Sequence, residues 1–549
     1  MSNDGNKNQD QPTTKKRKPR TKKPLCTFPE CGAVNALKEH VKKLAEENAV
    51  LKQQLADRDS RLEGMQAQLR NLQGDIFAPS SERLHLAAKD GVVVEEVDRY
   101  TGMVPTDDGL RKRGAQPGHT GRGRKLPDSI PMIEVIHHIP ADHKGCPICG
   151  KPYRELNLSA ESIEIDYEVK VICKKHRRMK AAKTCDCSVP SIITAPKPPQ
   201  IIPKGKFSTA FLCFTIVQKY FFQIPLNRQV QQWAMQDLEV NAGTLFGCFK
   251  AIMDFLSPLY DLLVNVSREQ NHWHVDETRW MVFSEVPGKT GFRWWLWVFA
   301  SKKVTLFVLD PSRSSKVPLN HFGQEAEGII NVDRYGAYHV LEGRIKRQLC
   351  WYHVRRDFIR AKEGSSALTD WADDWISDIH ILDALNDERV ACRNNEVLFV
   401  EKQALLETQI TNMAAKRDAQ LETGNLKPVQ VKTLKSLHRN WSGLSVFVGN
   451  PDIPIHNNVA ERALRSPAVG RNNYYGNHAR WSGEFAAMSM SILQTAAQHK
   501  LNVQAYLCYY LDACARLGKV PEDLENYLPW NIPEADRESL ALRRTKGRE

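Results

Sequence analysis

The chain has no long hydrophobic run. Across its 549 residues, no uninterrupted apolar stretch approaches the roughly eighteen residues that a membrane-spanning helix requires. The N-terminus is polar and then basic, so it also lacks the apolar core of a secretory signal. Both absences argue against membrane and secreted classes. We therefore expect a soluble, cytoplasmic protein without a membrane partner.

A disulfide framework is missing as well. The 13 cysteines are scattered along a long chain, a distribution that predicts reduced thiols and at most one metal site. Acidic residues are the minority charge, because 77 Lys and Arg outnumber 64 Asp and Glu and give a formal net charge of +13. Such an excess fits a polyanionic partner, although charge alone does not separate nucleic acid from an anionic membrane. The length predicts roughly three or four domains.

Two segments concentrate the positive charge. Residues 15–23 hold seven cations in nine positions within an N-terminal arm that has almost no apolar side chains. Residues 111–125 combine six cations with four glycines. The first could add phosphate contacts and the second could enter a narrow minor groove. A solubilising tail and a plain basic linker are the competing interpretations.

A strict apolar spacing follows the first arm. From Leu37 to Leu72 the seam positions alternate in steps of four and three over five heptads, and nine of eleven are apolar. This pattern predicts a coiled coil, and Asn48 at an a position favours a parallel homodimer in register. A single amphipathic helix packed on the chain's own core is the alternative.

Several cysteines have the spacing of metal ligands. Cys146-Pro-Ile-Cys149-Gly is a knuckle typical of half a structural zinc site, with Gly150 in the tight turn. Cys173 and His176 have the spacing of a second pair. A zinc ribbon and a set of coincidental thiols both stay open at this point.

The pattern becomes helical after Pro203. Residues 208–222 and 225–235 predict two helices, and Asn241 is a plausible N-cap for a third. Two short helices across a tight turn resemble a helix-turn-helix that enters a major groove. The third helix carries few cations and many apolar residues, so a purely structural bundle is the alternative.

Three acidic residues each end a hydrophobic run or begin a helix. Asp276 lies in His-Val-Asp-Glu-Thr and Asp333 in Asn-Val-Asp-Arg-Tyr-Gly, both in or at the end of predicted buried strands, while Glu461 begins a predicted helix. An unpaired carboxylate is costly in such places. Carboxylates from two strands and one helix can converge on divalent cations, as in enzymes that transfer phosphoryl groups. Glu277 is either a residue that supports the metal ligands or an ordinary solvated acid, and we expect the solvated acid because Glu277 should point to the opposite face of its strand.

These segments resemble a known family. His-Val-Asp-Glu-Thr, Val-Asp-Arg-Tyr-Gly-Ala-Tyr, Cys350-Trp-Tyr-His-Val-Arg-Arg-Asp-Phe and Asn-Asn-Val-Ala-Glu-Arg-Ala-Leu-Arg occur in this order. Together they resemble the insertion-sequence sixty-six family of bacterial transposases, over about residues 37 to 515. The resemblance implies a ribonuclease-H-like fold with an Asp-Asp-Glu triad, carried here by Asp276, Asp333 and Glu461.

The resemblance also implies a set of ligands. The triad would bind Mg²⁺ or Mn²⁺, and double-stranded DNA, as transposon inverted repeats and target, would be the substrate. Cys185 and Cys187 lie where the family's second zinc pair would, but with one intervening residue instead of two. The family's Arg-Lys-Asn after the glutamate helix appears here as Arg471-Asn-Asn, with one cation fewer. Predicted phosphate-binding residues are His353, Arg356, Arg462, Arg465 and Arg471.

The expected fold class is multidomain α/β: a ribonuclease-H-like core with an all-α insertion, preceded by a coiled coil, a zinc-ribbon-like segment and helix-turn-helix-like helices. The expected domains are a basic arm at 1–32, the coiled coil at 33–75, a basic linker at 76–130, the zinc-ribbon-like domain at 131–203, the helix-turn-helix-like domain at 204–266, the catalytic core at 267–345 and 453–518, the helical insertion at 346–452 and a polar tail at 519–549.

Three functions fit these features. The first is an active transposase that works as a dimer through residues 37–72, with accessory proteins of the same element as further partners. The second is a DNA-binding regulatory or domesticated relative without catalysis, which the missing cation near Arg471 keeps open. The third is a general nuclease, which explains the triad but not the coiled coil or the knuckle.

Overall fold

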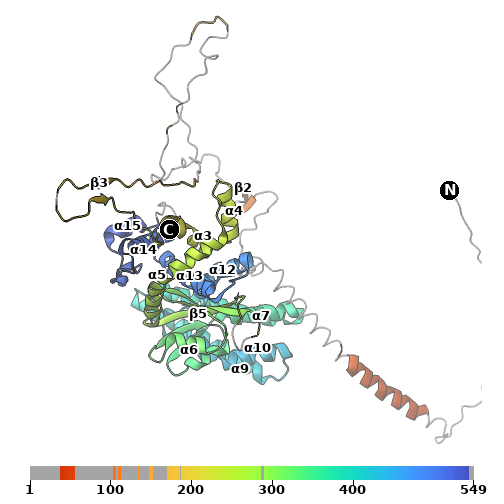
Figure 1. Cartoon of the computed structure of the whole chain (residues 1–549). Coiled ribbons are helices and arrows are strands. Elements are labelled where there is room, and N and C mark those ends of the chain that lie inside the picture. The colour runs from red at the N-terminus through yellow and green to blue at the C-terminus, as the bar shows by residue number, and fades with distance from the viewer. Residues whose placement is uncertain are drawn as a thin grey trace, which may run out of the picture. The chain divides into compact units, whose positions relative to one another are not determined.

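The computed structural model describes residues 37–55, 58, 103–106, 109–112, 134, 136, 148–152, 170–185, 187–285 and 290–542. The chain divides into two compact units: Met1–Ala78 with Glu363–Ser366, and Pro79–Lys362 with Ala367–Glu549. Within the described residues, no helix is long and apolar enough to cross a membrane. The architecture is mixed α/β with a mixed sheet, as the sequence predicted at that level (Figure 1).

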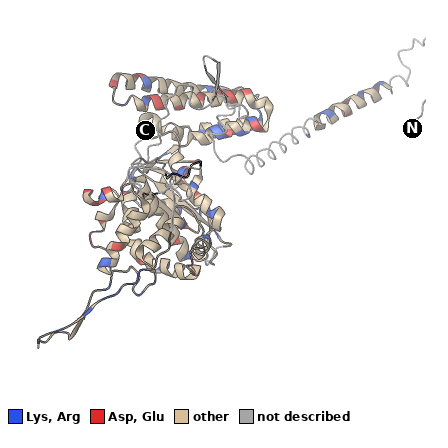
Figure 2. Ribbon diagram, turned by 90° about the horizontal axis from the view of Figure 1, so that it is seen from above, with Lys and Arg blue, Asp and Glu red and all other residues tan. Residues whose placement is uncertain are grey.

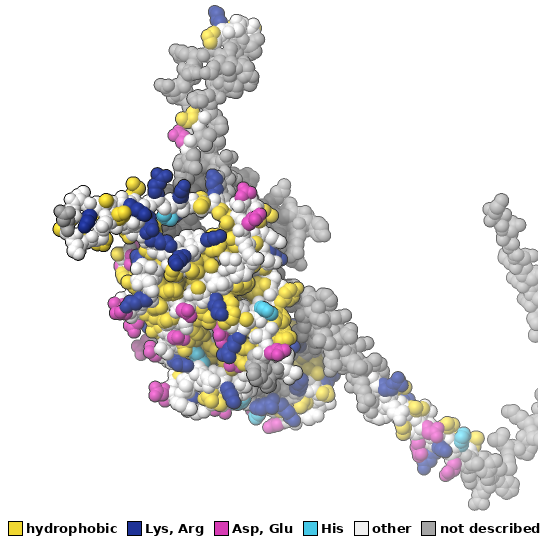
Figure 3. Space-filling view, viewed as in Figure 1, with side chains coloured by type: hydrophobic (Ala, Val, Ile, Leu, Met, Phe, Trp, Pro, Cys, Tyr) yellow, Lys and Arg dark blue, Asp and Glu magenta, His cyan; other side chains and the backbone are white. Residues whose placement is uncertain are grey.

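The first unit contains a helix over residues 37–55 that exposes its apolar seam. Leu37, Val41, Leu44, Leu51 and Leu55 are each at least 45% exposed, and hydrophobic and charged side chains both show on this helix in Figure 3. Asn48 donates a hydrogen bond to the carbonyl of Leu44. The predicted continuation to Leu72 lies outside the described residues, apart from Arg58. Exposed leucines at heptad spacing in one chain are what a partner helix would cover.

A five-stranded sheet forms the centre of the second unit. Its order is β7-β6-β5-β8-β9, with β5, β6 and β7 antiparallel and β8 and β9 parallel to β5. The strands are β5 (His272–Met281), β6 (Arg293–Ala300), β7 (Thr305–Asp310), β8 (Gly328–Val332) and β9 (Ile345–Leu349). Tryptophan, phenylalanine and branched side chains are buried on both faces of the sheet, and such residues favour strands. The strands predicted from residues 273 to 332 are confirmed, with bounds within one or two residues of the prediction.

The helices of the second unit cover the sheet and extend beyond it. Their bounds are α3 (Thr209–Tyr220), α4 (Leu226–Ala234), α5 (Ala242–Arg268), α6 (Lys316–Phe322), α7 (Trp351–Gly364), α8 (Thr369–Ala391), α9 (Glu396–Glu422), α10 (Pro428–Arg439), α11 (Trp441–Leu444), α12 (Asn458–Tyr474), α13 (Arg480–Gln498), α14 (Val503–Leu517) and α15 (Glu534–Leu540). The 3₁₀ segments are η2 (Gly336–Leu341), η3 (Ser366–Leu368), η4 (Val446–Gly449) and η5 (Leu524–Tyr527).

Helix α13 covers one free edge of the sheet. The backbone amides of Thr305 and Phe307 in β7 donate to the hydroxyls of Thr495 and Ser491. These bonds pair an edge strand that would otherwise expose its amides to another chain. Small residues along α13 make this close approach possible.

The predicted helix-turn-helix segment packs into the same core as the sheet. Asn241 caps α5 as predicted, accepting a hydrogen bond from the Gly243 amide at 2.7 Å. Apolar residues at helical spacing, from Leu245 to Leu263, are fully buried, and α5 contacts α13 and β7. Residues 204–266 are therefore not a separate compact unit, because the long apolar face of α5 needs the sheet and α13 to cover it.

A helical region follows β9, as expected for residues 346–452, although β9 itself extends to Leu349. Cationic and anionic residues are interspersed along its helices (Figure 2), and ion pairs such as Lys402–Glu388 and Lys416–Asp378 join them. Arg389 is fully buried and donates to the carbonyls of Phe447 and Val448. These bonds hold α8 against the segment that returns the chain to α12.

The segment that was predicted to be a polar tail, residues 519–549, is packed in its described part. Residues up to 542 pack on the body of the unit, with Leu528, Ile532 and Leu540 at most 5% exposed. The amide of Asn502 donates to the carbonyl of Leu540 at 2.8 Å. The few apolar residues in this segment have no regular period, so no pattern predicted that they would pack on a common surface.

Outside the sheet, short hairpins are formed by β1 (Met103–Thr106) with β2 (Gly109–Lys112) and by β3 (Lys180–Ala182) with β4 (Ile192–Thr194). Cys185 and Cys187 lie in the connection of the second hairpin, where the Cys187 backbone lowers the pKa of the Cys185 thiol. Cys149 and Cys173 are exposed free thiols, while Cys146 lies outside the described residues. The predicted zinc site thus stays a prediction.

Acid should destabilise the core through buried histidines. His321 in α6 is 5% exposed, stacks on Phe299 at 3.7 Å and has its pKa lowered to about 3 by burial. The unfolded chain binds this proton below about pH 6.5 and the folded chain does not, so stability falls as pH drops through that value. Each such histidine lowers the free energy of unfolding by about 1.4 kcal/mol between pH 7.5 and 5.5.

Urea unfolding of His321→Gln should show a pH dependence of the free energy of unfolding that is smaller by up to that amount. The exposed His478→Gln control should retain the wild-type pH dependence, and an unchanged slope in both variants contradicts the prediction.

Candidate active site

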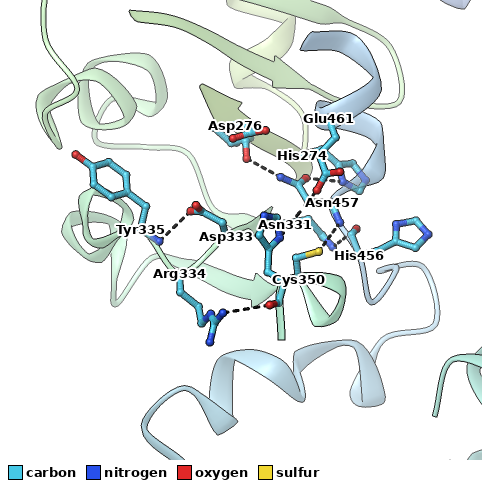
Figure 4. A network of polar contacts seen from close by, with 12 residues as sticks. His274, Asp276, Asn331, Asp333, Arg334, Tyr335, Cys350, His456, Asn457 and Glu461 are labelled. Atoms are coloured by element: carbon cyan, nitrogen blue, oxygen red, sulfur yellow. Dashed lines mark hydrogen bonds and ion pairs between the residues drawn. The ribbon is translucent and has the colours of Figure 1, made fainter. Parts of the chain in front are cut away.

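Asp276 lies within β5, and Asp333 directly follows the end of the neighbouring strand β8. In the parallel β5–β8 pair, His274 stands opposite Asn331, and each aspartate follows two residues later. The amide of Glu277 donates to Asp276 Oδ1 at 2.8 Å and the amide of Tyr335 donates to Asp333 Oδ1 at 2.9 Å. Each backbone bond fixes one carboxylate oxygen, and Figure 4 shows both side chains with Glu461 in one small region.

The electrostatics agree with this convergence. Burial raises the pKa of Asp276 well above its usual range, and the negative charges of Glu277, Asp333 and Glu461 raise it further. Three carboxylates that repel one another are costly in the absence of a cation. A divalent ion with oxygen ligands would relieve this repulsion, so the donor set suits Mg²⁺ or Mn²⁺.

Asn457 positions the helix that carries Glu461. Its side chain donates to the carbonyl of Val275 at 2.8 Å, and its Oδ1 accepts a hydrogen bond from His274 Nδ1 at 3.1 Å. Burial lowers the pKa of His274 to about 3, so this ring is neutral. Asn457 therefore joins the first turn of α12 directly to the strand of Asp276.

A second buried asparagine connects the neighbouring strand to the same loop. Asn331 in β8 donates to the carbonyls of Pro454 and His456 at 2.6 and 3.1 Å, and accepts a bond from His272. The sequence motifs did not single out Asn331, Asn457, His272 or His274 as parts of the site. Asparagines inside apolar strands or beside a helix start were the only available signal.

His353 and Cys350 lie next to Glu461. The Nδ1 atom of His353 is 3.9 Å from Glu461 Oε1, and ligand atoms of all three residues lie within 4.8 Å of one another. This geometry also resembles a site for a softer metal. Burial raises the pKa of Cys350 to about 12, and its sulfur accepts a hydrogen bond from the Asn457 amide, so a metal at this position would have to displace the thiol proton. Burial and nearby arginines lower the pKa of His353 to about 4.

Of the predicted phosphate-binding arginines, Arg356 and Arg462 lie near the site. The positive charge of Arg356 acts on His353 and that of Arg462 on His274. Arg465 is exposed one turn along α12 from Glu461. Arg471 lies further away, where its Nη1 donates to Thr278 Oγ1 and to the carbonyl of Arg279.

The expectation for Glu277 was wrong. Its side chain is 1% exposed, forms an ion pair with Arg313 and accepts a hydrogen bond from the Tyr338 hydroxyl at 2.7 Å. Burial raises its pKa, while Tyr338 and Arg313 oppose that shift. Glu277 does point away from Asp276, but η2 and the segment before α6 cover that face, so it is not solvated.

The comparisons with known proteins agree with the sequence motifs. The family model described as Transposase IS66 family matches residues 204–484, just over half of the chain. Three similar proteins come from Sinorhizobium fredii (strain NBRC 101917 / NGR234). Uncharacterized protein y4jD is 24% identical over 77% of this chain and 85% of its own length. Uncharacterized protein y4hP is 23% identical over 88% and 90%, and uncharacterized protein y4qI is 24% identical over 91% and 98%. The chain therefore belongs to the IS66 family of transposases.

Proposed function

We propose that the protein is the transposase of a bacterial insertion sequence, which binds terminal inverted repeats and cuts and joins DNA with divalent metal ions. The observation that carries this proposal is the convergence of Asp276, Asp333 and Glu461 from two adjacent strands and a helix of a family-matched segment. A mixed sheet with one carboxylate inside β5 and another just after the neighbouring strand β8 supports a ribonuclease-H-like core.

In this proposal the three carboxylates hold one or two Mg²⁺ or Mn²⁺ ions. When bound, such ions would supply Lewis-acid catalysis to the attacking water or 3′-hydroxyl and to the phosphoryl group. Asp276 and Asp333 each present one oxygen while a backbone amide fixes the other. Asn457 and His274 fix the direction from which Glu461 approaches. Neutral His353, 3.9 Å from Glu461, can orient a water or a leaving group.

Other parts of the chain supply the DNA context in this proposal. The seam at residues 37–72 would form a homodimer that holds two transposon ends, supported by the exposed leucines of residues 37–55. The Cys185–Cys187 hairpin would provide half of a structural zinc site with Cys146 and Cys149. Arg356, Arg462, Arg465 and the basic arms would contact phosphates, and accessory proteins of the element are further candidate partners.

The test is a cleavage assay with the full-length protein. Purified protein, Mg²⁺ and a duplex that carries the inverted-repeat end should release a 3′-hydroxyl at the end. Binding without cleavage in Mg²⁺ or Mn²⁺ would support the catalytically inactive relative instead. Equal cleavage of duplexes without the end would support a general nuclease.

Asn457→Ala should impair cleavage by displacing Glu461. Loss of two side-chain hydrogen bonds lets the first turn of α12 shift, and a displacement of about 1 Å can cost on the order of 100-fold in rate. We expect cleavage to fall about 10- to 100-fold and half-maximal activity to require more Mg²⁺. The neighbouring Asn458→Ala is the matched control and should cleave normally. An unchanged Mg²⁺ requirement in folded Asn457→Ala would contradict this positioning role.

A further inference from the structure

The β5–β6 hairpin continues past the carboxylates. Strand β5 pairs with β8 only as far as His274, but it pairs with β6 as far as Met281. The last residues of β5 therefore have no strand on the side of β8. Arg471 from α12 occupies this edge and bonds Thr278 and the carbonyl of Arg279.

A hollow of about 670 Å³ lies at this end of the hairpin, and we call it the hairpin groove. Its lining includes four arginines, one tryptophan and one buried carboxylate: Arg279, Arg293, Arg313, Arg471, Trp295 and Glu277. Strand register explains why three of them meet. Arg279 stands directly opposite Trp295, and Met281 opposite Arg293, so their side chains share one face. Because Glu277 points away from Asp276, the groove meets the Asp276 side of β5 at its edge, where Arg471 bonds Thr278, two residues after Asp276 on the same face.

The arginines of the groove are prepared to bind an anion. Arg279 and Arg293 are exposed, and neither has an ion-pair partner among the residues that the structure describes. Arg313 is held rigidly, because its Nε donates to Glu277 at 2.7 Å and its guanidinium stacks on Tyr335 and Trp295 at 3.8 and 4.8 Å. A fixed guanidinium loses little side-chain entropy when it binds phosphate. Four cations thus face one carboxylate that is already paired with Arg313.

We propose that the hairpin groove binds the phosphodiester backbone of DNA beside the scissile bond. This inference rests on the proposed function and assigns it a phosphate-binding surface that includes Arg279, Arg293 and Arg313. The arginines of this surface would also compensate for the cation that is missing from the family pattern at Arg471-Asn-Asn. Asn472 stands at the position of the family's lysine, and Arg279, Arg293 and Arg313 supply cations in the hollow that Arg471 also lines.

Salt-dependent DNA binding tests the proposal. The double variant Arg279→Gln/Arg293→Gln removes two exposed cations without breaking an ion pair in the described part of the chain. Arg516→Gln/Lys519→Gln, exposed near the end of α14, removes the same charge elsewhere. Fluorescence anisotropy with the end-containing duplex would give affinity across salt concentrations. We expect the groove variant to bind about tenfold more weakly and to lose about two from the slope of log affinity against log salt. The control should stay within about twofold of wild type.

Neutral methylphosphonate linkages locate the contact. Substituting them one at a time beside the scissile position should weaken DNA binding by the wild-type protein at one or two positions. Binding by the groove variant should not change at those positions. If the groove variant binds DNA with the same affinity and the same salt slope as the control variant, the hairpin groove does not bind the phosphodiester backbone. The proposed transposase function would still stand in that case, provided that the wild type cleaves DNA. A wild-type protein that fails to bind DNA would overturn both.

Discussion

Asp276→Asn should reduce DNA cleavage by at least about 1,000-fold, which corresponds to about 4 kcal/mol of lost transition-state stabilisation. The same holds for Asp333→Asn and Glu461→Gln, because each change removes one formal charge from the proposed metal ligands. DNA affinity should remain equal or rise slightly, since a negative charge next to phosphates is lost. Single-turnover cleavage and equilibrium binding on the same duplex would measure the two effects separately.

Stability gives an independent readout for Asp276. Burial and three neighbouring carboxylates raise the pKa of Asp276, so its ionised form is disfavoured in the fold at neutral pH. The metal-free Asp276→Asn variant should therefore unfold at a higher temperature than wild type. Added Mg²⁺ should stabilise wild type but not the variant.

The matched control is Asp452→Asn. Asp452 is exposed and pairs with Arg393, so this variant should cleave normally. Full activity in any of the three triad variants would refute the assignment of that carboxylate.

Leu44→Lys/Leu51→Lys should convert the proposed homodimer into monomers. Both leucines are exposed on the helix of residues 37–55 and lie at d positions of the heptads. Burying a leucine contributes about 1.5–3 kcal/mol, so losing two per chain should raise the dimer dissociation constant by more than about 100-fold. Sedimentation velocity over a concentration series would measure it.

Ala49→Lys/Val50→Lys is the control for the added charge. These residues also lie on the exposed helix but outside the seam, so this variant should remain dimeric. If both variants are dimeric, another surface of the chain forms the dimer. A monomeric Leu44→Lys/Leu51→Lys protein should still bind single ends but should lose coordinated cleavage of paired ends.

Local patterns were sufficient for the elements that carry the site. The alternation of buried residues around Trp273 and Trp294 and the apolar run to Val332 predicted β5, β6 and β8, and Asn241 predicted the start of α5. Such signals depend on residues close in sequence, which share one strand face or one helix stripe. The same reasoning placed Asp276 and Asp333 in or at the end of buried strands, and in the structure Asp276 lies inside β5 while Asp333 follows β8.

Long-range packing was not predictable from these patterns. The burial of Glu277 depends on Tyr338 and Arg313, which reach it from 61 and 36 residues away. The position of Glu461 depends on the bonds between Asn457 and β5 across 182 and 183 residues. No periodicity in the chain encodes such pairs.

The sequence by itself determined the family, predicted the strands and helices of the core, and singled out three acidic residues as candidate metal ligands. These features were accessible because motifs and periodicity are local properties of the chain. Only the tertiary structure decided how the carboxylates converge, why Glu277 is a paired buried acid, and that arginines from β5, β6, the segment after β7 and α12 share one groove. The physical reason is that these contacts arise when distant segments pack together, and their energies depend on burial and neighbouring charge rather than on residue type alone.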